Sequence, residues 1–347
     1  MQHMAAPHKS IKRSSNLFVG LSLAIIILLY ILSTEAFGSI LHHPKLQMFK
    51  MMFLSIMIEA MPFILIGVVL SALVEVFVSE QTIRRMIPKN PILGIITASV
   101  LGIIFPLCEC GMVPAVRRLI QKGMPVYVAT TFIIVGPILN PIVFWSTFTA
   151  FRNKPEIVYS RMGLAFAVAL LVGLIVHRIV KTNPLKGSES AAAHSQDAGH
   201  HHNHGTNQRS VFNKLVEVMR HSISEFFEMG KYLMFGAMLV GLLQTFVSKG
   251  SMIELGHGVG SSNLLMMGFG IILSLCSTSD AFVAQSFITT FSQGSLVAFM
   301  VLGPMLNLKG ILMMSAVFKP RFVVLYSSLV ILFVYVGTLL LEQFVLK

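Results

Sequence analysis

Charged residues are scarce in this 347-residue chain: they form 12% of it, where a soluble domain carries about 25%. A water-soluble fold needs that polar surface, so the scarcity excludes an ordinary soluble protein. Hydrophobic residues form 55% of the chain, and the mean hydropathy is +0.79. The length gives room for many apolar segments of about 20 residues, each long enough to cross a bilayer. The sequence therefore predicts an all-α membrane protein with about seven to nine transmembrane helices.

Cysteine and acidic residues are also few. The three cysteines, Cys108, Cys110 and Cys276, are an odd number and imply no disulfide framework. The net charge of +12 comes from basic clusters between apolar runs, as topology signals do, so no nucleic acid partner is expected. No P-loop, nucleophile elbow or dinucleotide fingerprint occurs. We therefore predict a transporter rather than an enzyme, with no cofactor.

The apolar runs divide the chain into four parts. Residues 1–50 have a basic start and a first apolar run over 17–32 without a convincing cleavage site, which favours an uncleaved first span with a cytoplasmic N-terminus. A first permease repeat is expected over 51–180. A polar, histidine-rich cytoplasmic linker with an amphipathic segment follows over 181–228, and a second permease repeat over 229–347.

The two repeats are inferred from recurring motifs. The sequence Gly-Pro-x-Leu-Asn occurs at 136–140 and at 303–307, an offset of 167 positions. Ser274-Leu275-Cys276 corresponds to Pro106-Leu107-Cys108 at an offset of 168. Glu228 and Gly236 fall opposite Glu59 and Gly67 at an offset of 169. Three anchors in the same order predict an internal duplication.

The distribution of basic residues predicts how the repeats are oriented. Lys and Arg are shared evenly between the two sides if 91–107 and 263–276 cross fully, but they gather on the cytoplasmic side if 91–122 and 263–292 are re-entrant hairpins. Each half then has three full spans plus one hairpin, and an odd number of spans inverts the second half. Inverted repeats with broken helices are typical of transporters whose substrate site lies near the midplane.

The tip of the first hairpin holds a carboxylate between two thiols, Cys108-Glu109-Cys110, flanked by helix-breaking prolines and a glycine. A charge at membrane depth costs about 2.5–3.5 kcal/mol and usually faces a cavity or a partner. Thiols in this arrangement suit soft, thiophilic ions. The alternative is that the cysteines are small packing residues and that Glu109 pairs with a basic group.

The second tip reads Cys276-Ser277-Thr278-Ser279-Asp280, a polar run inside an apolar hairpin. Ser and Thr can cap freed backbone groups, but Asp280 exceeds what capping needs. We therefore assign Cys276, Ser277, Thr278 and Asp280 to a substrate site with the first tip. If the halves are pseudosymmetric, Cys108 and Cys276 approach one another at the centre.

The Gly-Pro-x-Leu-Asn motifs are expected to break two long helices near mid-depth, because proline removes a backbone donor. Asn140 and Asn307 can then bind the exposed carbonyls or a ligand; a purely structural kink is the alternative. Lys309 has Ile142 as its counterpart, and as a buried lysine it needs an anion, for which Asp280 and Glu109 are candidates. Glu59 and Glu228 near the start of each repeat are weaker candidates, since both could be interfacial.

Histidines cluster in the linker, and imidazole suits borderline metals such as Zn²⁺ or Ni²⁺. On a flexible segment they would chelate or sense metal rather than form the transport path, and a merely polar linker is the alternative. The candidate metal ligands are His200, His201, His202 and His204.

At the Pro-Leu-Cys-Glu-Cys-Gly tip and the two Gly-Pro-x-Leu-Asn breaks, the chain resembles the bacterial YraQ/ArsP-like permease family over most of 50–345. The resemblance implies a multi-pass permease of the bacterial cell membrane. The characterised branch exports trivalent organoarsenicals with cysteine as the soft ligand, which implies such roles for the three cysteines here. Some relatives work with a small membrane partner subunit, which implies such a partner for this chain. A homo-oligomer is the alternative assembly.

We therefore predict a permease that works by alternating access, driven by the proton gradient, and exports a small solute such as a thiophilic metalloid or metal species. The alternatives from other classes are a membrane-embedded enzyme, a non-transporting subunit with a metal-sensing or envelope-related role, and a lipid-carrier transporter.

Overall fold

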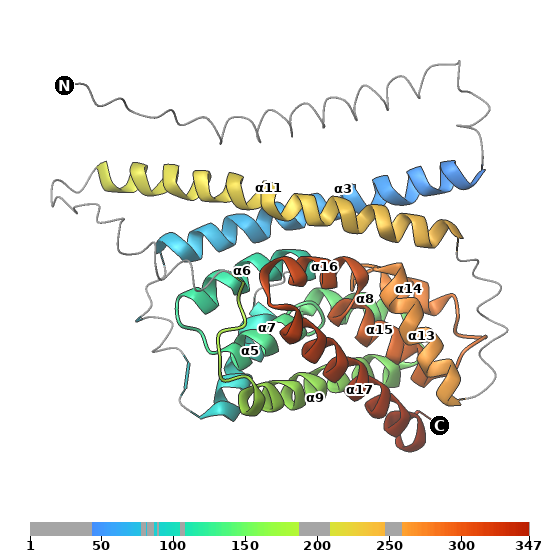
Figure 1. Ribbon diagram of the computed structural model, residues 1–347. Helices are drawn as coiled ribbons and strands as arrows, with labels where there is room; N and C mark the ends of the chain where they lie inside the picture. Colours follow the sequence, from blue (N-terminus) through green and yellow to red (C-terminus); the bar gives the residue numbers. More distant parts are fainter. Residues whose placement is uncertain are drawn as a thin grey trace, which may run out of the picture. The chain divides into compact units, whose positions relative to one another are not determined.

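The computed structural model describes residues 44–77, 81, 87–88, 90–104, 108–186, 209–246 and 259–346 (Figure 1). Residues 53–347 form one compact unit, and of residues 1–52 the described ones, 44–52, are the first turns of a helix. The described residues contain no β-strand, only an isolated bridge between Leu185 and Phe318. The predicted all-α class is confirmed. The apolar run 17–32 and the histidine cluster lie outside the described residues.

The helices follow the same order in the two halves of the chain. In the first half they are α3 (Pro44–Phe77), α5 (Pro91–Ile104), α6 (Glu109–Gln121), α7 (Val126–Val135), α8 (Pro141–Ala150) and α9 (Pro155–Ile179). In the second half they are α11 (Arg209–Phe246), α13 (Val259–Leu273), α14 (Asp280–Gln285), α15 (Gln293–Met305), α16 (Leu308–Val317) and α17 (Pro320–Phe344). The helices α8 and α16 have 10 residues each, and α9 and α17 have 25 each. This correspondence supports the duplication inferred from the motifs.

Five helical segments within the described ranges are long and apolar enough to cross a membrane. They are Pro44–Leu73, Pro155–Ile179, Val218–Thr245, Gln293–Val317 and Pro320–Phe344. Shorter apolar helices cover Pro91–Ile103, Val126–Val135 and Gly260–Leu273. Large apolar side chains such as Val324, Leu332 and Leu340 on α17 are more than half exposed in the bare protein, as lipid-facing residues would be. The chain is a multi-pass membrane protein.

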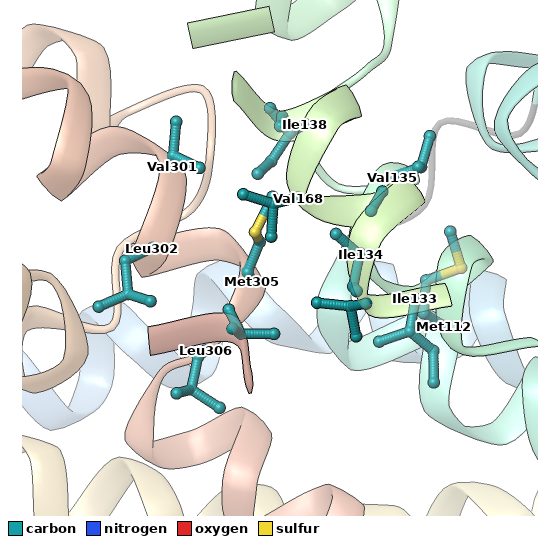
Figure 2. Close-up of a cluster of buried hydrophobic side chains, with 14 of the residues drawn as sticks. Met112, Ile133, Ile134, Val135, Ile138, Val168, Val301, Leu302, Met305 and Leu306 are labelled. Carbon is teal, nitrogen blue, oxygen red and sulfur yellow. The ribbon is translucent and has the colours of Figure 1, made fainter. Parts of the chain in front are cut away.

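The centre of the compact unit is built from α7 and α15. Every residue of α7 from Tyr127 to Val135 is buried, and so is every residue of α15 from Gly294 to Met305. Helix α7 packs between α5 and α9, and α15 packs between α13 and α17. Figure 2 shows the ends of these two helices, with Ile134 and Ile138 on one side, Met305 on the other, and Val168 of α9 among them. The two helix breaks, which follow α7 and α15, therefore lie in the core.

At each helix break, the asparagine side chain forms hydrogen bonds with both the preceding and the following helix. Asn140 accepts a hydrogen bond from the Val143 amide at 2.9 Å and donates to the Gly136 carbonyl at 3.2 Å. Asn307 accepts from the Gly310 amide at 2.8 Å and donates to the Gly303 carbonyl at 3.0 Å. A helix end leaves such amides and carbonyls without partners, and apolar surroundings make unpaired backbone groups costly. One amide side chain thus serves the end of one helix and the start of the next.

Replacing these asparagines by aspartate separates the two roles, since aspartate keeps the oxygen that caps the following helix but loses the amide donor. Asn140→Asp is expected to lower the free energy of unfolding by about 1–2 kcal/mol. Asn307→Asp is expected to cost more, because the new carboxylate would face Glu109, which Asn307 contacts at 3.1 Å. Chemical unfolding in mixed micelles measures both, and an equal cost at the two positions would contradict the expectation.

Candidate functional site

The first polar tip begins at Cys108, the N-cap residue of α6, whose backbone is extended. The Cys108 carbonyl accepts hydrogen bonds from the amides of Gly111 and Met112, both at 3.1 Å. This places Glu109 in the first turn of α6, where a helix favours a negative charge. The Glu109 side chain is 9% exposed. The carboxylate at this tip is therefore enclosed by protein.

Lys309, in the first turn of α16, lies against that carboxylate. Its Nζ atom is 3.3 Å from Glu109 Oε1 and donates a hydrogen bond to the Ser274 carbonyl oxygen at 3.2 Å. The lysine is 5% exposed. Ser274 lies just before the second polar tip, so one ammonium group contacts the first tip and the segment that leads into the second. Of the two anions named as candidate partners for Lys309, the structure places Glu109 in contact with it.

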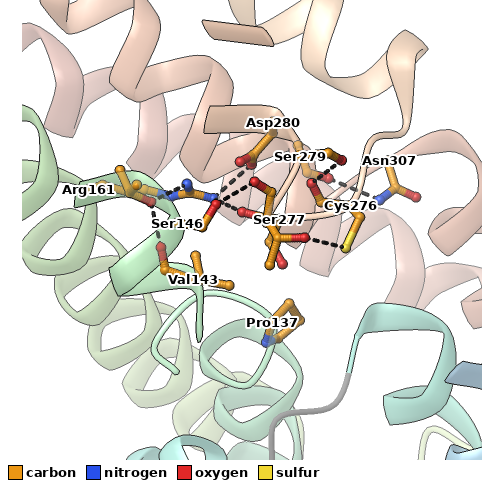
Figure 3. A network of polar contacts seen from close by, with 12 residues as sticks. Pro137, Val143, Ser146, Arg161, Cys276, Ser277, Ser279, Asp280 and Asn307 are labelled. Carbon is orange, nitrogen blue, oxygen red and sulfur yellow. Dashed lines mark hydrogen bonds and ion pairs between the residues drawn. The ribbon is translucent and has the colours of Figure 1, made fainter. Parts of the chain in front are cut away.

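The second polar tip is built on Asp280, the first residue of α14, which pairs with Arg161 of α9 (Figure 3). Arg161 Nη2 lies 2.7 Å from Asp280 Oδ2, and the two side chains are 0% and 3% exposed. The same guanidinium donates to the Ser277 carbonyl at 3.0 Å and to Thr147 Oγ1 at 2.8 Å. A fully buried arginine is stable only when paired and hydrogen-bonded, and here it fixes the shape of the tip.

Further contacts attach the second tip to the first half of the chain. Ser146 of α8 donates to the Thr278 carbonyl at 2.6 Å. Within the tip, the Cys276 carbonyl accepts from the amides of Ser279 and Asp280, both at 3.0 Å. The Cys276 thiol lies 3.4 Å from the Thr278 hydroxyl. The tip is thus a compact hydrogen-bonded turn that rests on α8 and α9.

The two ion pairs are arranged crosswise between the halves. Glu109 of the first half pairs with Lys309 of the second, and Asp280 of the second half pairs with Arg161 of the first. Each pair joins the acid of one tip to a base on a helix of the other half. A movement of one half relative to the other therefore strains or breaks both pairs.

Each buried pair leaves polar atoms without a hydrogen-bond partner among the described residues: Glu109 Oε2, Asp280 Oδ1 and Arg161 Nε. Buried polar atoms in proteins are normally paired. These atoms lie on the two acids of the tips and on the base that holds one of them. Each of these atoms can form one further hydrogen bond.

The structure brings some of the predicted site residues into direct contact. Glu109 contacts both Asn307 and Lys309, and Lys309 also donates to the carbonyl of Ser274, which precedes the second tip. Asn140 bonds only within its own break in the contacts described. Cys108 and Cys276 are free thiols, both partly buried. Cys110 lies in α6, but its side chain is outside the described part of the structure.

The histidine-rich linker is the segment for which a bound metal ion, as distinct from a transported one, is predicted. The four candidate histidines, His200, His201, His202 and His204, lie outside the described residues. Within the described residues, no group of three or more His, Cys, Asp or Glu side chains could hold a metal ion.

Sequence reasoning missed Arg161, the buried base of the second tip. It occurs at the seventh position of the apolar helix α9, and a charged residue inside an apolar run is the signal that could have identified it.

Sequence reasoning also missed a group of residues that joins α11 to the first half. Glu225, which is 2% exposed, accepts a hydrogen bond from Ser71 at 2.9 Å and lies 3.7 Å from Arg118. Glu228 pairs with Arg117 at 3.3 Å near the surface, and Glu59 is exposed.

Comparison with known proteins gives a consistent family. The ArsP_1 family model, described as "Predicted permease", matches residues 45–343. A protein of Bacillus subtilis (strain 168) named "UPF0718 protein YcgR" is 45% identical over 290 residues, which cover 84% of this chain and 95% of the relative. A Streptococcus mutans protein named "Putative two-component membrane permease complex subunit" is 37% identical over 283 residues, covering 81% of this chain and 91% of the relative. No solved structure matches the chain.

Proposed function

The chain belongs to the ArsP_1 family of predicted permeases, and from that premise we propose that it exports a small thiophilic solute, a metalloid or metal species. The solute passes through a site between the two polar tips by alternating access. The observation that carries the proposal is the Lys309 ammonium, which contacts Glu109 of one tip and Ser274 beside the other inside an apolar bundle. Ionisable residues within membrane-spanning segments commonly mark substrate or ion pathways.

The arrangement of the halves supports alternating access. In this proposal the two halves are inverted repeats, and 91–122 and 263–292 are re-entrant hairpins whose tips meet at the midplane. Transporters of this kind bind their substrates where discontinuous helices of the two repeats meet. Two breaks joined by asparagine and two ion pairs that cross between halves fit such a site.

The thiols favour a soft substrate. Cys108 is the N-cap of α6, directly before Glu109 of the first tip, and Cys276 is the first residue of the second tip. Thiolate ligands select soft ions over Mg²⁺ or Ca²⁺. In the proposed site the two thiols bind the solute, and the carboxylates, Ser277 and Thr278 surround it.

Cys108→Ala and Cys276→Ala test the proposal in everted membrane vesicles with a trivalent monomethylarsenical as the probe. Each substitution removes one soft ligand, so we expect the initial rate of uptake to fall by about tenfold, which corresponds to the loss of roughly 1.4 kcal/mol of binding. Ser286→Ala, at an exposed serine just after α14, is the matched control and should leave the rate unchanged. Full activity of both cysteine variants would refute a thiol site.

A second candidate function is favoured by the name of the S. mutans relative, a subunit of a two-component complex. In this proposal the chain transports only together with a small membrane partner. Blue-native electrophoresis compares the tagged chain from its own membranes with the same chain expressed alone in a foreign host. A larger species and flux in the native membranes only would support the complex, and a single equal species with equal flux would reject it.

A further inference from the structure

The Lys309 ammonium lies where two oxygen atoms from different parts of the chain converge. These are Glu109 Oε1 at 3.3 Å and the Ser274 carbonyl oxygen at 3.2 Å. Asn307 donates to the same Glu109 oxygen at 3.1 Å and so fixes its position. Unwound backbone carbonyls coordinate Na⁺ in transporters, and carboxylate oxygens are likewise ligands of hard cations. The lysine thus places a tethered monovalent cation in an oxygen-lined position.

The carbonyl is available because helix α13 ends just before it. The last residue of α13 is Leu273, and Ser274 has a φ of 48°, a left-handed conformation uncommon for a residue other than glycine. This turn directs the Ser274 carbonyl out of the helical ladder to Lys309. The C-terminal end of a helix also carries partial negative charge. Both features favour a cation at this point.

The first half of the chain shows that the helix break does not require a lysine. Helix α8 has the same length as α16, and its Asn140 makes the same capping bond as Asn307. Yet the counterpart of Lys309 there is Ile142, whose side chain is 58% exposed. The break therefore folds without a charged residue. The presence of a lysine at position 309 is therefore not required by the helix break, and its contacts with other groups are the remaining reason for it.

The other charged groups near α16 are engaged elsewhere. Helix α16 packs against α6, α11 and α17. On α6 and α11, Arg117 pairs with Glu228, and Arg118 lies beside Glu225, while Lys231 and Tyr232 of α11 are exposed. Gly236 is the α11 residue that faces the Lys309 backbone, and Tyr326 of α17 donates to the Met305 carbonyl. Of the charged groups named here, Glu109 lies within ion-pair distance of the Lys309 ammonium.

We propose that Lys309 is the proton-binding residue of this permease and that its ammonium occupies a monovalent-cation site formed by Glu109 and Ser274. The inference deepens the proposed function and rests on it. With its proton, Lys309 neutralises Glu109; when the proton leaves to water, the uncharged amine remains and the site carries one negative charge. The movement of one proton thereby changes the contact between the two halves. Removal of the lysine leaves a site for free Na⁺.

The test uses the purified full chain in detergent and needs no transported substrate. Thermal unfolding of Lys309→Ser is measured in NaCl and in choline chloride at one ionic strength. We expect Na⁺ to raise the melting temperature of this variant by about 3 °C in a saturable manner, and to leave the wild-type protein unchanged. Ile142→Ser is the matched variant in the other half and should show no response to Na⁺.

The double variant Glu109→Gln with Lys309→Ser distinguishes Na⁺ binding at this site from a general effect of salt on stability. It removes the Glu109 carboxylate, which is the charged ligand of the proposed site. Its response to Na⁺ should be absent. No saturable response in Lys309→Ser, or an equal response in the double variant, would overturn the proposal. Since no flux is measured, such a result would leave the test of the thiol site in vesicles intact.

Lys309→Arg provides the second measurement if Lys309→Ser does not fold. Arginine keeps its charge at every accessible pH, so its pairing with Glu109 cannot be lost by deprotonation. The wild-type protein should therefore lose thermal stability at alkaline pH relative to Lys309→Arg, as the Lys309 proton leaves and Glu109 remains buried without a cation. Superimposable stability profiles for the two proteins between neutral and alkaline pH would show that Lys309 does not release a proton.

Discussion

Arg161→Met is expected to lower the free energy of unfolding by about 3–5 kcal/mol, the range for removing one partner of a buried ion pair. The substitution leaves Asp280, which is 2% exposed, without its cation. It also removes the donors to the Ser277 carbonyl and Thr147. Unfolding of the purified protein by SDS in mixed micelles measures the loss.

Two further variants show whether the charge pair is the cause. Adding Asp280→Leu to Arg161→Met removes both charges and should recover most of the stability, because an apolar replacement of a whole pair is often neutral. Tyr326→Phe is the matched control, since Tyr326 is the seventh residue of α17 as Arg161 is of α9. It removes one neutral hydrogen bond and should cost about 1 kcal/mol. A double variant less stable than Arg161→Met would contradict the role assigned to the pair.

Gly67→Ala is expected to destabilise the protein by about 3 kcal/mol, because α3 and α6 approach too closely at this glycine for any side chain. A Cβ atom on Gly67 would lie 2.3 Å from the Gly111 Cα and 2.8 Å from its carbonyl oxygen. These are backbone atoms, so the helices themselves must separate, and overpacking of this kind costs about 1–3 kcal/mol or more. The same micelle unfolding experiment measures it.

Gly163→Ala in α9 is the matched control, because a Cβ atom there would meet nothing within 4 Å. Alanine has the higher helix propensity by up to about 1 kcal/mol, so this variant should be as stable as the wild-type protein or slightly more stable. Equal losses in Gly67→Ala and Gly163→Ala would mean that the close approach of the helices is unimportant.

Local sequence features predicted much of the fold. Apolar length gave the membrane class, and the repeated Gly-Pro-x-Leu-Asn motif identified both helix breaks, because proline and asparagine act within a few residues of their own position. Because a buried lysine needs an anion nearby, the sequence also named two candidate partners for Lys309. The choice between Glu109 and Asp280 required the arrangement of the helices.

Arg161 could not be paired from the sequence alone. Its partner Asp280 is 119 positions away, and the contact exists only because α9 and the second tip pack together. The link between Ser71 and Glu225 spans 154 positions and depends in the same way on packing. The transport roles of the thiols, the inverted orientation of the repeats, the domain limits and the linker histidines stay predictions.

The crosswise pairing of acids and bases has a consequence for how the protein is made. The ribosome incorporates Glu109 and Arg161 well before Lys309 and Asp280, so both of these charges enter the membrane before their partners are synthesised. Those charges must stay hydrated, or be shielded by insertion factors, until translation ends. Halves expressed from separate genes would gain their buried ion pairs only by associating with each other, which makes the complete chain the unit of membrane assembly.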